Sequence, residues 1–124
     1  MMKILVVDDD PMVLDSCELI LRSEGYVVSL TSSVKEALQM LEEKKYDLLL
    51  VDVIMPEYDG IYLIGNVREN LPHLPILVMS GYPTPETISS GMRMGATHFI
   101  AKPFTPDELI TAVRKALLKG QEEI

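Results

Sequence analysis

Five short apolar runs, separated by stretches with helical spacing, divide the chain into alternating elements. The runs lie at residues 3–7, 26–30, 48–51, 75–80 and 97–101. The run at 48–51 is apolar throughout, which is typical of a strand buried on both faces. Between the runs, apolar residues recur every three or four positions, as they do on the buried side of an amphipathic helix. The pattern therefore predicts a strand followed by a helix, five times over.

Residues with capping chemistry mark the ends of the predicted helices. Asp10 before Pro11 suits an N-cap followed by proline in the first turn, and Gly25 suits the position just past a helix. The third helix is predicted over residues 61–70. The later helix starts are indicated by Ser33 with Glu36, by Thr84-Pro85, and by Thr105 with Glu108, and Asp59-Gly60 marks a turn before the third helix.

Buried strands joined by crossover helices predict an α/β fold in which helices cover both faces of a parallel sheet. With right-handed crossovers, the natural arrangement is a flavodoxin-like, doubly wound sheet of five strands in the order 2-1-3-4-5, with five helices. A chain of 124 residues has room for one core. We therefore expect residues 1–124 to form a single domain.

Composition removes several classes of function. The net charge of -8 argues against direct nucleic-acid binding by this domain. No apolar run approaches the roughly 20 residues of a membrane-spanning helix. The run at 3–7 is too short for a signal peptide and is followed at once by acids. The single cysteine, Cys17, excludes an internal disulfide and is expected to be a buried, inert side chain. These features predict a cytoplasmic protein without a membrane segment.

Polar residues follow the predicted strands at the edge where such sheets bind ligands. In open parallel sheets this edge lies at the carboxyl ends of the strands, next to the point where the strand order reverses. The residues that the strands deliver there are Asp8 and Asp9 from the first, Asp52 from the third, Ser80 from the fourth and Lys102 from the fifth.

Three carboxylates close together repel one another unless a cation compensates them. Oxygen ligands alone suit Mg²⁺, and the two histidines, His73 and His98, lie away from this edge, which argues against zinc. A metal, an ammonium and a hydroxyl together suit phosphoryl chemistry. In such a pocket the central carboxylate, Asp52, is a candidate nucleophile that forms an aspartyl phosphate.

Each of these residues also has an ordinary structural interpretation. Asp52 could cap a loop or a helix, Asp8 or Asp9 could favour a helix N-terminus, Ser80 could belong to a turn, and Lys102 could be solvated. Their occurrence together, each at the correct strand end, favours the functional interpretation.

The ordered motifs resemble the receiver domain of two-component response regulators, which act in histidine–aspartate phosphorelays. The resemblance extends from Lys3 to about Leu118. The motifs that carry it are the acidic stretch Ile4–Pro11, the stretch Asp52–Pro56 with Asp59-Gly60, the stretch Met79–Gly81, and Gly95-Ala96 followed by Phe99–Phe104.

The resemblance implies that Asp52 takes a phosphoryl group from a histidine kinase or a histidine phosphotransfer protein. It implies that Asp9 and Asp52 bind Mg²⁺ directly with the backbone carbonyl of Ile54, and that Asp8 does so through water. Lys102 would pair with the phosphoryl group or with Asp52. Such a domain promotes its own phosphorylation and dephosphorylation and is not an enzyme of many turnovers.

The resemblance also implies how a signal leaves the site. Ser80 and Phe99 would couple phosphorylation to the surface formed by the fourth helix, fifth strand and fifth helix, where an output domain or protein would bind. The Lys102–Pro103 peptide bond is expected to be cis. Two positions depart from the commoner family pattern. Phe99 is often tyrosine in relatives, and Ile54 is often polar, so we expect Ile54 to slow loss of the phosphoryl group.

Two other classes of function remain as alternatives. A Mg²⁺-dependent aspartyl-phosphate phosphatase would need a second acid and usually a cap, for which 124 residues leave no room. A receiver-like interaction module that is never phosphorylated would have lost a site residue, and none is missing here. The sequence is compatible with a stand-alone regulator and with a receiver cut from a hybrid kinase or a larger regulator.

Overall fold

The computed structural model describes residues 1–53, 60–81 and 84–122 and contains a parallel five-stranded sheet in the order β2-β1-β3-β4-β5. This confirms the predicted fold and strand order. The strands are β1 (Lys3–Val7), β2 (Val27–Thr31), β3 (Leu48–Asp52), β4 (Ile76–Ser80) and β5 (His98–Ala101).

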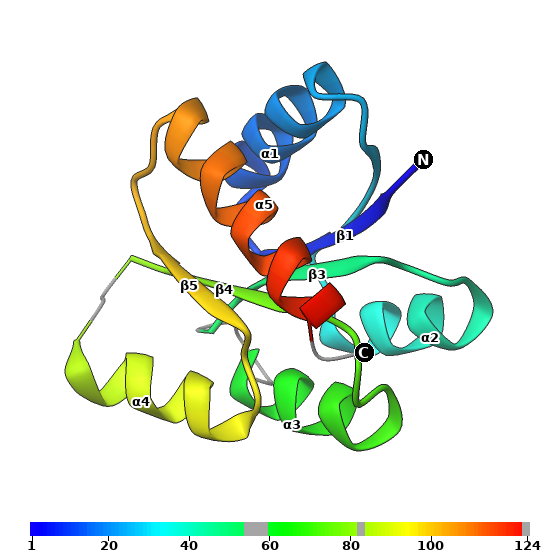
Figure 1. Ribbon diagram of the computed structural model, residues 1–124, viewed down its shortest axis with the longest axis vertical. Coiled ribbons are helices and arrows are strands. Elements are labelled where there is room, and N and C mark those ends of the chain that lie inside the picture. The colour runs from blue at the N-terminus through cyan, green and yellow to red at the C-terminus, as the bar shows by residue number, and fades with distance from the viewer. Residues whose placement is uncertain (54–59, 82–83, 123–124) are drawn as a thin grey trace.

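Helices cover both faces of this sheet, and the chain alternates between strand and helix throughout. Helices α1 and α5 lie on one face, and α2, α3 and α4 lie on the other (Figure 1). In the described part of the chain, none of them has both the length and the apolar character that a bilayer crossing requires. The helices are α1 (Pro11–Ser23), α2 (Val34–Glu43), α3 (Gly60–Asn70), α4 (Pro85–Met94) and α5 (Pro106–Glu122).

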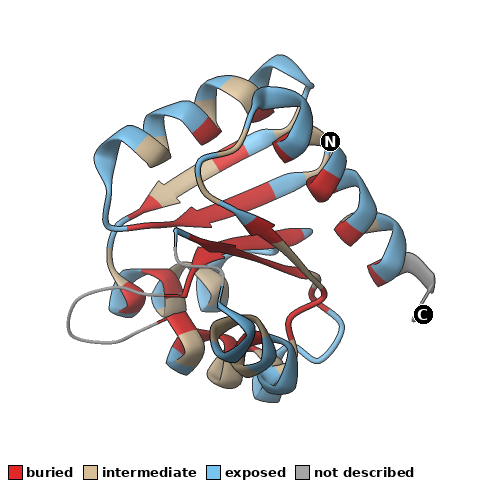
Figure 2. Cartoon of the chain, turned by 90° about the vertical axis from the view of Figure 1, so that its left-hand side faces the viewer, coloured by how far each residue is buried: buried red, intermediate tan, exposed pale blue. Residues whose placement is uncertain are grey.

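The central strands are buried on both faces, which explains why their sequences do not alternate. Every residue of β3 and β4 is buried, as Figure 2 shows for the middle of the sheet. Leu49 and Val51 belong to the core under α2 and α3, whereas Leu48 and Leu50 belong to the core under α1 and α5. Burying a leucine fully contributes about 1.5–3 kcal/mol, so the two cores fix the sheet between the helix layers.

Most of the predicted helix ends have the expected hydrogen bonds. The side chain of Asp10 accepts from the Met12 amide at 2.9 Å, and Gly25 adopts a left-handed φ of 88° just past α1. At the start of α5 the capping box is complete. The Thr105 amide donates to Glu108 Oε1 at 2.9 Å, and the Glu108 amide donates to Thr105 Oγ1 at 3.1 Å.

Several element bounds differ from the sequence prediction by one residue, and one capping box is only partly formed. The strand predicted at 26–30 begins at Val27, because the Tyr26 amide donates to the Leu21 carbonyl and so completes the end of α1. At the start of α2, Ser33 Oγ accepts from the Glu36 amide as predicted, but the Ser33 amide donates to Thr31 Oγ1 at 3.2 Å. A threonine hydroxyl thus occupies the position expected for the Glu36 side chain.

Cys17 lies within the core under α1 and is fully buried. Burial raises the pKa of its thiol to about 12, and the nearby charge of Asp8 acts in the same direction. The thiol therefore stays protonated at neutral pH and is an inert core side chain, as predicted.

Candidate functional site

The polar residues predicted at one edge of the sheet lie there in the structure. Asp8 follows β1, Asp52 ends β3, Ser80 ends β4 and Lys102 follows β5. The strand register holds these ends level, because Asp52 pairs with Met79 and Ser80 pairs with Ala101. The Lys102 amide also donates to the Ser80 carbonyl at 2.7 Å, which extends the pairing by one residue.

Lys102 lies between two buried carboxylates. Its Nζ donates to Asp8 Oδ2 and to Asp52 Oδ2, each at 2.7 Å. Asp8 is 0% exposed and Asp52 is 7% exposed, so both carboxylates are largely removed from water. The Lys102–Pro103 peptide bond is cis, the configuration that the family resemblance implies.

The charges of this cluster change the proton affinities of two of its members. Burial alone would lower the pKa of Lys102, but its hydrogen bonds to Asp52 and Asp8 outweigh burial and raise it. The ammonium is therefore retained at neutral pH. Burial raises the pKa of Asp8 above its ordinary value of 3.8, and the hydrogen bond from Lys102 only partly offsets this effect. Ionised Asp8 is thus a source of electrostatic cost in the folded protein.

A third carboxylate makes the cluster suitable for a divalent cation. Oxygen atoms of Asp8, Asp9 and Asp52 all lie within 4.8 Å of one another. Three carboxylates face one ammonium, so these four side chains carry a net charge of -2 when all are ionised. Oxygen ligands from carboxylates suit Mg²⁺, which keeps several of its water molecules. Asp9 is exposed, so the cluster is open to solvent on its side.

The carboxylate of Asp8 is oriented by groups of the protein itself. Its Oδ1 accepts from the Asp10 amide at 2.9 Å, while Oδ2 accepts from Lys102. Both oxygens of Asp8 therefore already have donors, whereas Asp9 lies at the exposed side of the cluster. The two neighbouring acids that follow β1 therefore differ, because Asp8 is buried and held by two donors whereas Asp9 is exposed to solvent.

Gly60 brings the chain back against the end of β3. Its amide donates to the Val53 carbonyl at 2.8 Å. A Cβ atom at this position would lie 1.9 Å from the Asp52 carbonyl oxygen, so only glycine fits without a shift of the backbone. Ile54, whose backbone carbonyl was predicted to bind the metal, lies outside the described residues.

Ser80 and Phe99 lie on the same face of the sheet. Phe99 pairs with Val78, two residues before Ser80 on the neighbouring strand, and it packs against the core under α2 and α3. Side chains two residues apart on a strand point to the same side. The helix α4 covers this place, because a Cβ on Gly91 would lie 3.7 Å from the Val78 side chain. Buried Ser80 is therefore connected to α4 and β5 through a short packed path.

Two contacts of the site were missed by the sequence analysis. One is the pairing of Lys102 with Asp8 in addition to Asp52. The other is the donation from the Asp10 amide to Asp8. An aspartate side chain that accepts from the amide two residues later is a common turn, so the sequence Asp8-Asp9-Asp10 held a usable signal for the second contact.

Comparisons with known proteins agree with this geometry. A family model described as the response regulator receiver domain matches residues 4–114. An uncharacterised 14.6 kDa protein of Leptolyngbya boryana is 42% identical over 120 residues, which cover 94% of this chain and 91% of the relative. The transcriptional regulatory protein ZraR of Escherichia coli (strain K12) is 38% identical over 114 residues, which cover 92% of this chain and 26% of ZraR. The chain thus spans about a quarter of the length of ZraR.

Solved structures show the same fold over the whole chain. A CheY-like response regulator receiver domain protein from Methanospirillum hungatei JF-1 superimposes with a TM-score of 0.94 at 30% identity, covering 100% of this chain and 99% of that one. NtrX from Brucella abortus gives a TM-score of 0.93 at 32% identity, covering 99% of this chain and 29% of NtrX. The fold therefore occurs both in proteins of this length and as part of longer ones.

Replacing Asp8 by Asn should stabilise the metal-free protein at pH 7. The change removes a buried charge of the acidic cluster, while Lys102 keeps its partner Asp52. We expect the free energy of unfolding to rise by about 1–2 kcal/mol, the lower part of the range seen when neutral residues replace buried ion pairs. Urea unfolding of the two proteins in the presence of a chelator measures the difference.

The gain in the free energy of unfolding from Asp8→Asn should become smaller as pH falls. Because the pKa of Asp8 is raised in the folded state, the folded wild type binds a proton more readily than the unfolded chain does. As pH falls from above the folded-state pKa of Asp8 toward 3.8, protonation of Asp8 raises the free energy of unfolding of the wild type. The difference in stability between Asp8→Asn and wild type therefore becomes smaller over that interval. Asp15→Asn, at an exposed position on α1, is the control and should change stability by less than about 0.5 kcal/mol. A variant less stable than wild type at pH 7 would contradict the account.

Proposed function

Because the chain belongs to the family of response regulator receiver domains of two-component systems, we propose that Asp52 is its phosphoryl acceptor. The observation that carries this proposal is the position of Asp52 at the end of the central strand β3, with Lys102 Nζ at 2.7 Å and two further carboxylates beside it. Asp8 also contacts Lys102, but Asp52 is the contacting acid that ends the central strand β3 beside the reversal of strand order.

The transfer is a displacement at phosphorus. An oxygen of the Asp52 carboxylate attacks the phosphorus of a phosphohistidine, a P–O bond forms, and the P–N bond breaks. The imidazole nitrogen leaves with the electron pair and takes up a proton from solvent. The Lys102 ammonium already lies at the attacking carboxylate, so its charge compensates the oxygens that arrive with the phosphoryl group.

We propose that Mg²⁺ is the cofactor, held directly by Asp9, Asp52 and the backbone carbonyl of Ile54, and through water by Asp8. The net charge of the cluster and the oxygen-only donor set support this choice. The donors already present on both oxygens of Asp8 favour its indirect role. When bound, the ion neutralises charge on the phosphoryl oxygens.

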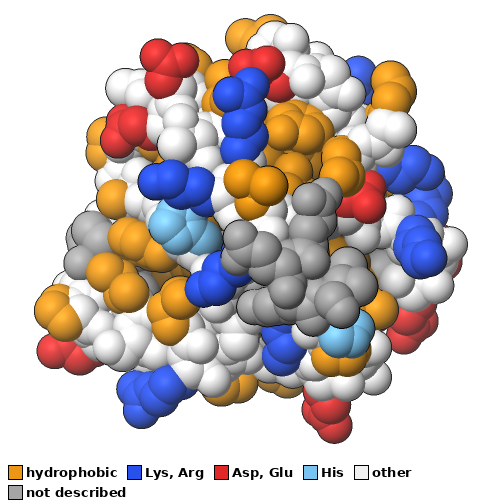
Figure 3. Space-filling view, viewed as in Figure 1, with side chains coloured by type: hydrophobic (Ala, Val, Ile, Leu, Met, Phe, Trp, Pro, Cys, Tyr) orange, Lys and Arg blue, Asp and Glu red, His pale blue; other side chains and the backbone are white. Residues whose placement is uncertain are grey.

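The proposed partners are a histidine kinase or a histidine phosphotransfer protein on the input side, and an output domain or protein on the other. The length of ZraR and NtrX beyond the matched region supports an output partner. Direct nucleic-acid binding by this domain is not favoured, since the chain carries a net charge of -8. On the face shown in Figure 3, basic side chains are interspersed with acidic and apolar ones and form no continuous stripe.

We further propose that Ser80 and Phe99 transmit the phosphorylated state. New phosphoryl oxygens beside Asp52 would draw the Ser80 hydroxyl inward as a hydrogen-bond donor. Phe99, half-buried on the same face of the sheet, is placed to follow into the space that is vacated beneath α4. Without a phenolic hydroxyl, Phe99 has no outward hydrogen bond to lose, so the two positions of its ring should be close in energy. Both would then be populated before phosphorylation.

Asp52→Asn should abolish phosphorylation by a small acyl phosphate in the presence of Mg²⁺. The amide cannot act as the nucleophile, and the other acids of the cluster lack its central position. Intact-mass spectrometry should detect one phosphoryl group on wild type and none on the variant. Asp47→Asn is the matched control, because this exposed aspartate lies just before β3 and should leave labelling unchanged. A phosphoryl group on the Asp52→Asn protein would show that another residue is the acceptor.

The ring of Phe99 should change its environment when a beryllofluoride mimic of the phosphoryl group binds. The chain has two phenylalanines, Phe99 and Phe104, so Phe104→Leu leaves the Phe99 ring as the single phenylalanine signal. We expect its aromatic NMR shifts to move together with the Ser80 amide, and to lie between two extremes in the unmodified protein. An unchanged Phe99 ring alongside a clear shift at Ser80 would remove Phe99 from the mechanism.

A further inference from the structure

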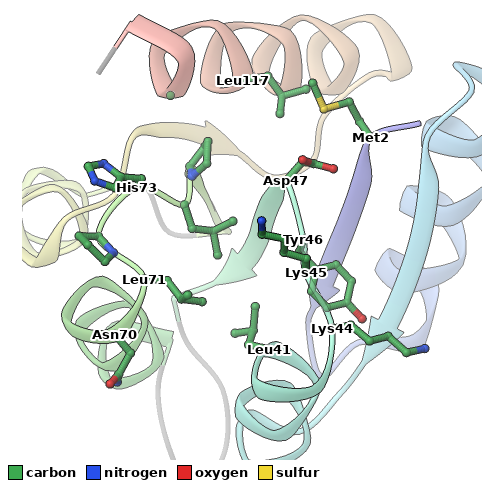
Figure 4. Close-up of a pocket in the computed structure, with 14 residues that line it drawn as sticks. Met2, Leu41, Lys44, Lys45, Tyr46, Asp47, Asn70, Leu71, His73 and Leu117 are labelled. Atoms are coloured by element: carbon green, nitrogen blue, oxygen red, sulfur yellow. The ribbon is translucent and has the colours of Figure 1, made fainter. Parts of the chain in front are cut away.

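A cavity of about 650 Å³ lies at the edge of the sheet opposite the acidic cluster. Its walls come from the end of α2 with the segment that leads to β3, the end of α3 with the segment that leads to β4, the last turns of α5, and Met2 before β1. Most of the wall is apolar, as Figure 4 shows around Leu41, Leu71 and Leu117. Cavities of roughly 300–1,000 Å³ with apolar walls and few polar groups are typical of small-molecule sites.

The charged groups of this cavity favour an anion. Two lysines, Lys44 and Lys45, line it, and neither forms an ion pair with any residue in the described ranges. Figure 4 shows Lys45 between Asp47 and Leu41, at the centre of one wall. The carboxylate of Asp47 already accepts from the Lys3 amide at 2.7 Å, so one of its oxygens has a donor. The cavity therefore combines an apolar wall with available positive charge.

This local charge is opposite in sign to that of the whole chain. The chain carries a net charge of -8, and its acidic cluster lies at the far ends of the strands. An anion that enters this cavity is therefore separated by the length of the sheet from the carboxylates of the acidic cluster. Because water and salt screen distant charges, the electrostatic energy of the anion is set by the charged groups of the wall, which are the two lysines and the carboxylate of Asp47.

We propose that this cavity binds a small amphipathic monoanion, with an apolar ring or short chain against Leu41, Leu71 and Leu117 and the acidic group at Lys45. The apolar wall supplies most of the affinity, and the lysine selects for the negative group. Such a site is independent of Asp52 and would give the domain a second input of a different chemical kind.

Two fluorescent dyes test this chemistry on the 124-residue chain. The anionic probe is 8-anilinonaphthalene-1-sulfonate, and the neutral probe is N-phenyl-1-naphthylamine, which has the same rings without the sulfonate. We expect both to gain fluorescence with the folded protein. We expect Lys45→Gln to weaken the anionic dye about fivefold, which corresponds to one partly exposed charge contact, and to leave the neutral dye unchanged.

Two further variants separate the cavity from the rest of the surface. Leu41→Trp places a larger side chain in the wall and should weaken both dyes. Lys35→Gln removes an exposed lysine elsewhere on α2 and is the control, which should change neither. Amide NMR shifts of the wild-type protein, which need no variant, should map the anionic dye to residues 44–47 and to the non-proline residues of the segment 70–74.

Several results would overturn the proposal. These are no binding of the anionic dye, shifts that map elsewhere, or an equal response of Lys45→Gln and Lys35→Gln. If the double variant Glu122→Gln/Glu123→Gln bound the neutral dye tenfold more tightly than wild type does, the chain's own acidic end would be the occupant of the cavity. Dye affinity that falls as protein concentration rises would mean that a second copy of the chain occupies it.

Discussion

The site depends on one electrostatic constraint, the meeting of three carboxylates with a single lysine at the end of the sheet. Lys102 Nζ lies 2.7 Å from both Asp8 and Asp52, and the oxygens of Asp9 lie within 4.8 Å of the other two acids. Two of these acids are buried, so each ionised group is costly unless a cation is near. The fold tolerates this cost because the apolar cores on either side of β3 and β4 fix the strand ends in place. The negative charge that makes the cluster costly by itself is therefore the charge that would attract the proposed Mg²⁺.

The same strand register links this charge to two other parts of the molecule. Ser80 ends the strand beside Asp52, and Phe99 lies on the same face one strand further, paired with Val78, which faces Gly91 of α4. The proposed movement of Ser80 and Phe99 would therefore carry a change at the site toward α4 and β5. At the other ends of the strands, Lys45 belongs to a connecting segment, and the apolar wall of the far cavity includes Leu41 of α2 and Leu117 of α5. The two edges of the sheet are therefore chemically distinct, one acidic and prepared for metal, the other apolar with basic residues.

Much of this arrangement could be predicted from the sequence, and the reasons are physical. The unbroken apolar runs of β3 and β4 require burial on both faces, which in a chain of alternating strands and helices leaves few topologies. The strand order then places Asp8, Asp52, Ser80 and Lys102 at one edge. Lys102 contacts Asp8 as well as Asp52 because of its side-chain conformation, and the spacing of apolar residues along the chain does not determine that conformation. The first residue of β2 depended on whether Tyr26 completes α1 or joins the strand. The far cavity is formed by two connecting segments and the ends of helices that are distant in sequence, so no local pattern indicated it.

The most direct test is the linkage between Mg²⁺ and folding, measured by urea unfolding of the unphosphorylated protein over a range of Mg²⁺ concentrations. If the cluster holds the ion, the free energy of unfolding should rise by about 2.7 kcal/mol when free Mg²⁺ is ~100-fold above its dissociation constant. Asp9→Ala should lose much of this gain, because Asp9 is the exposed carboxylate of the cluster. Asp15→Asn, on the outer side of α1, should keep all of it. A gain in Asp9→Ala equal to that of wild type, or no gain in wild type, would contradict the assignment of this cluster as the metal site.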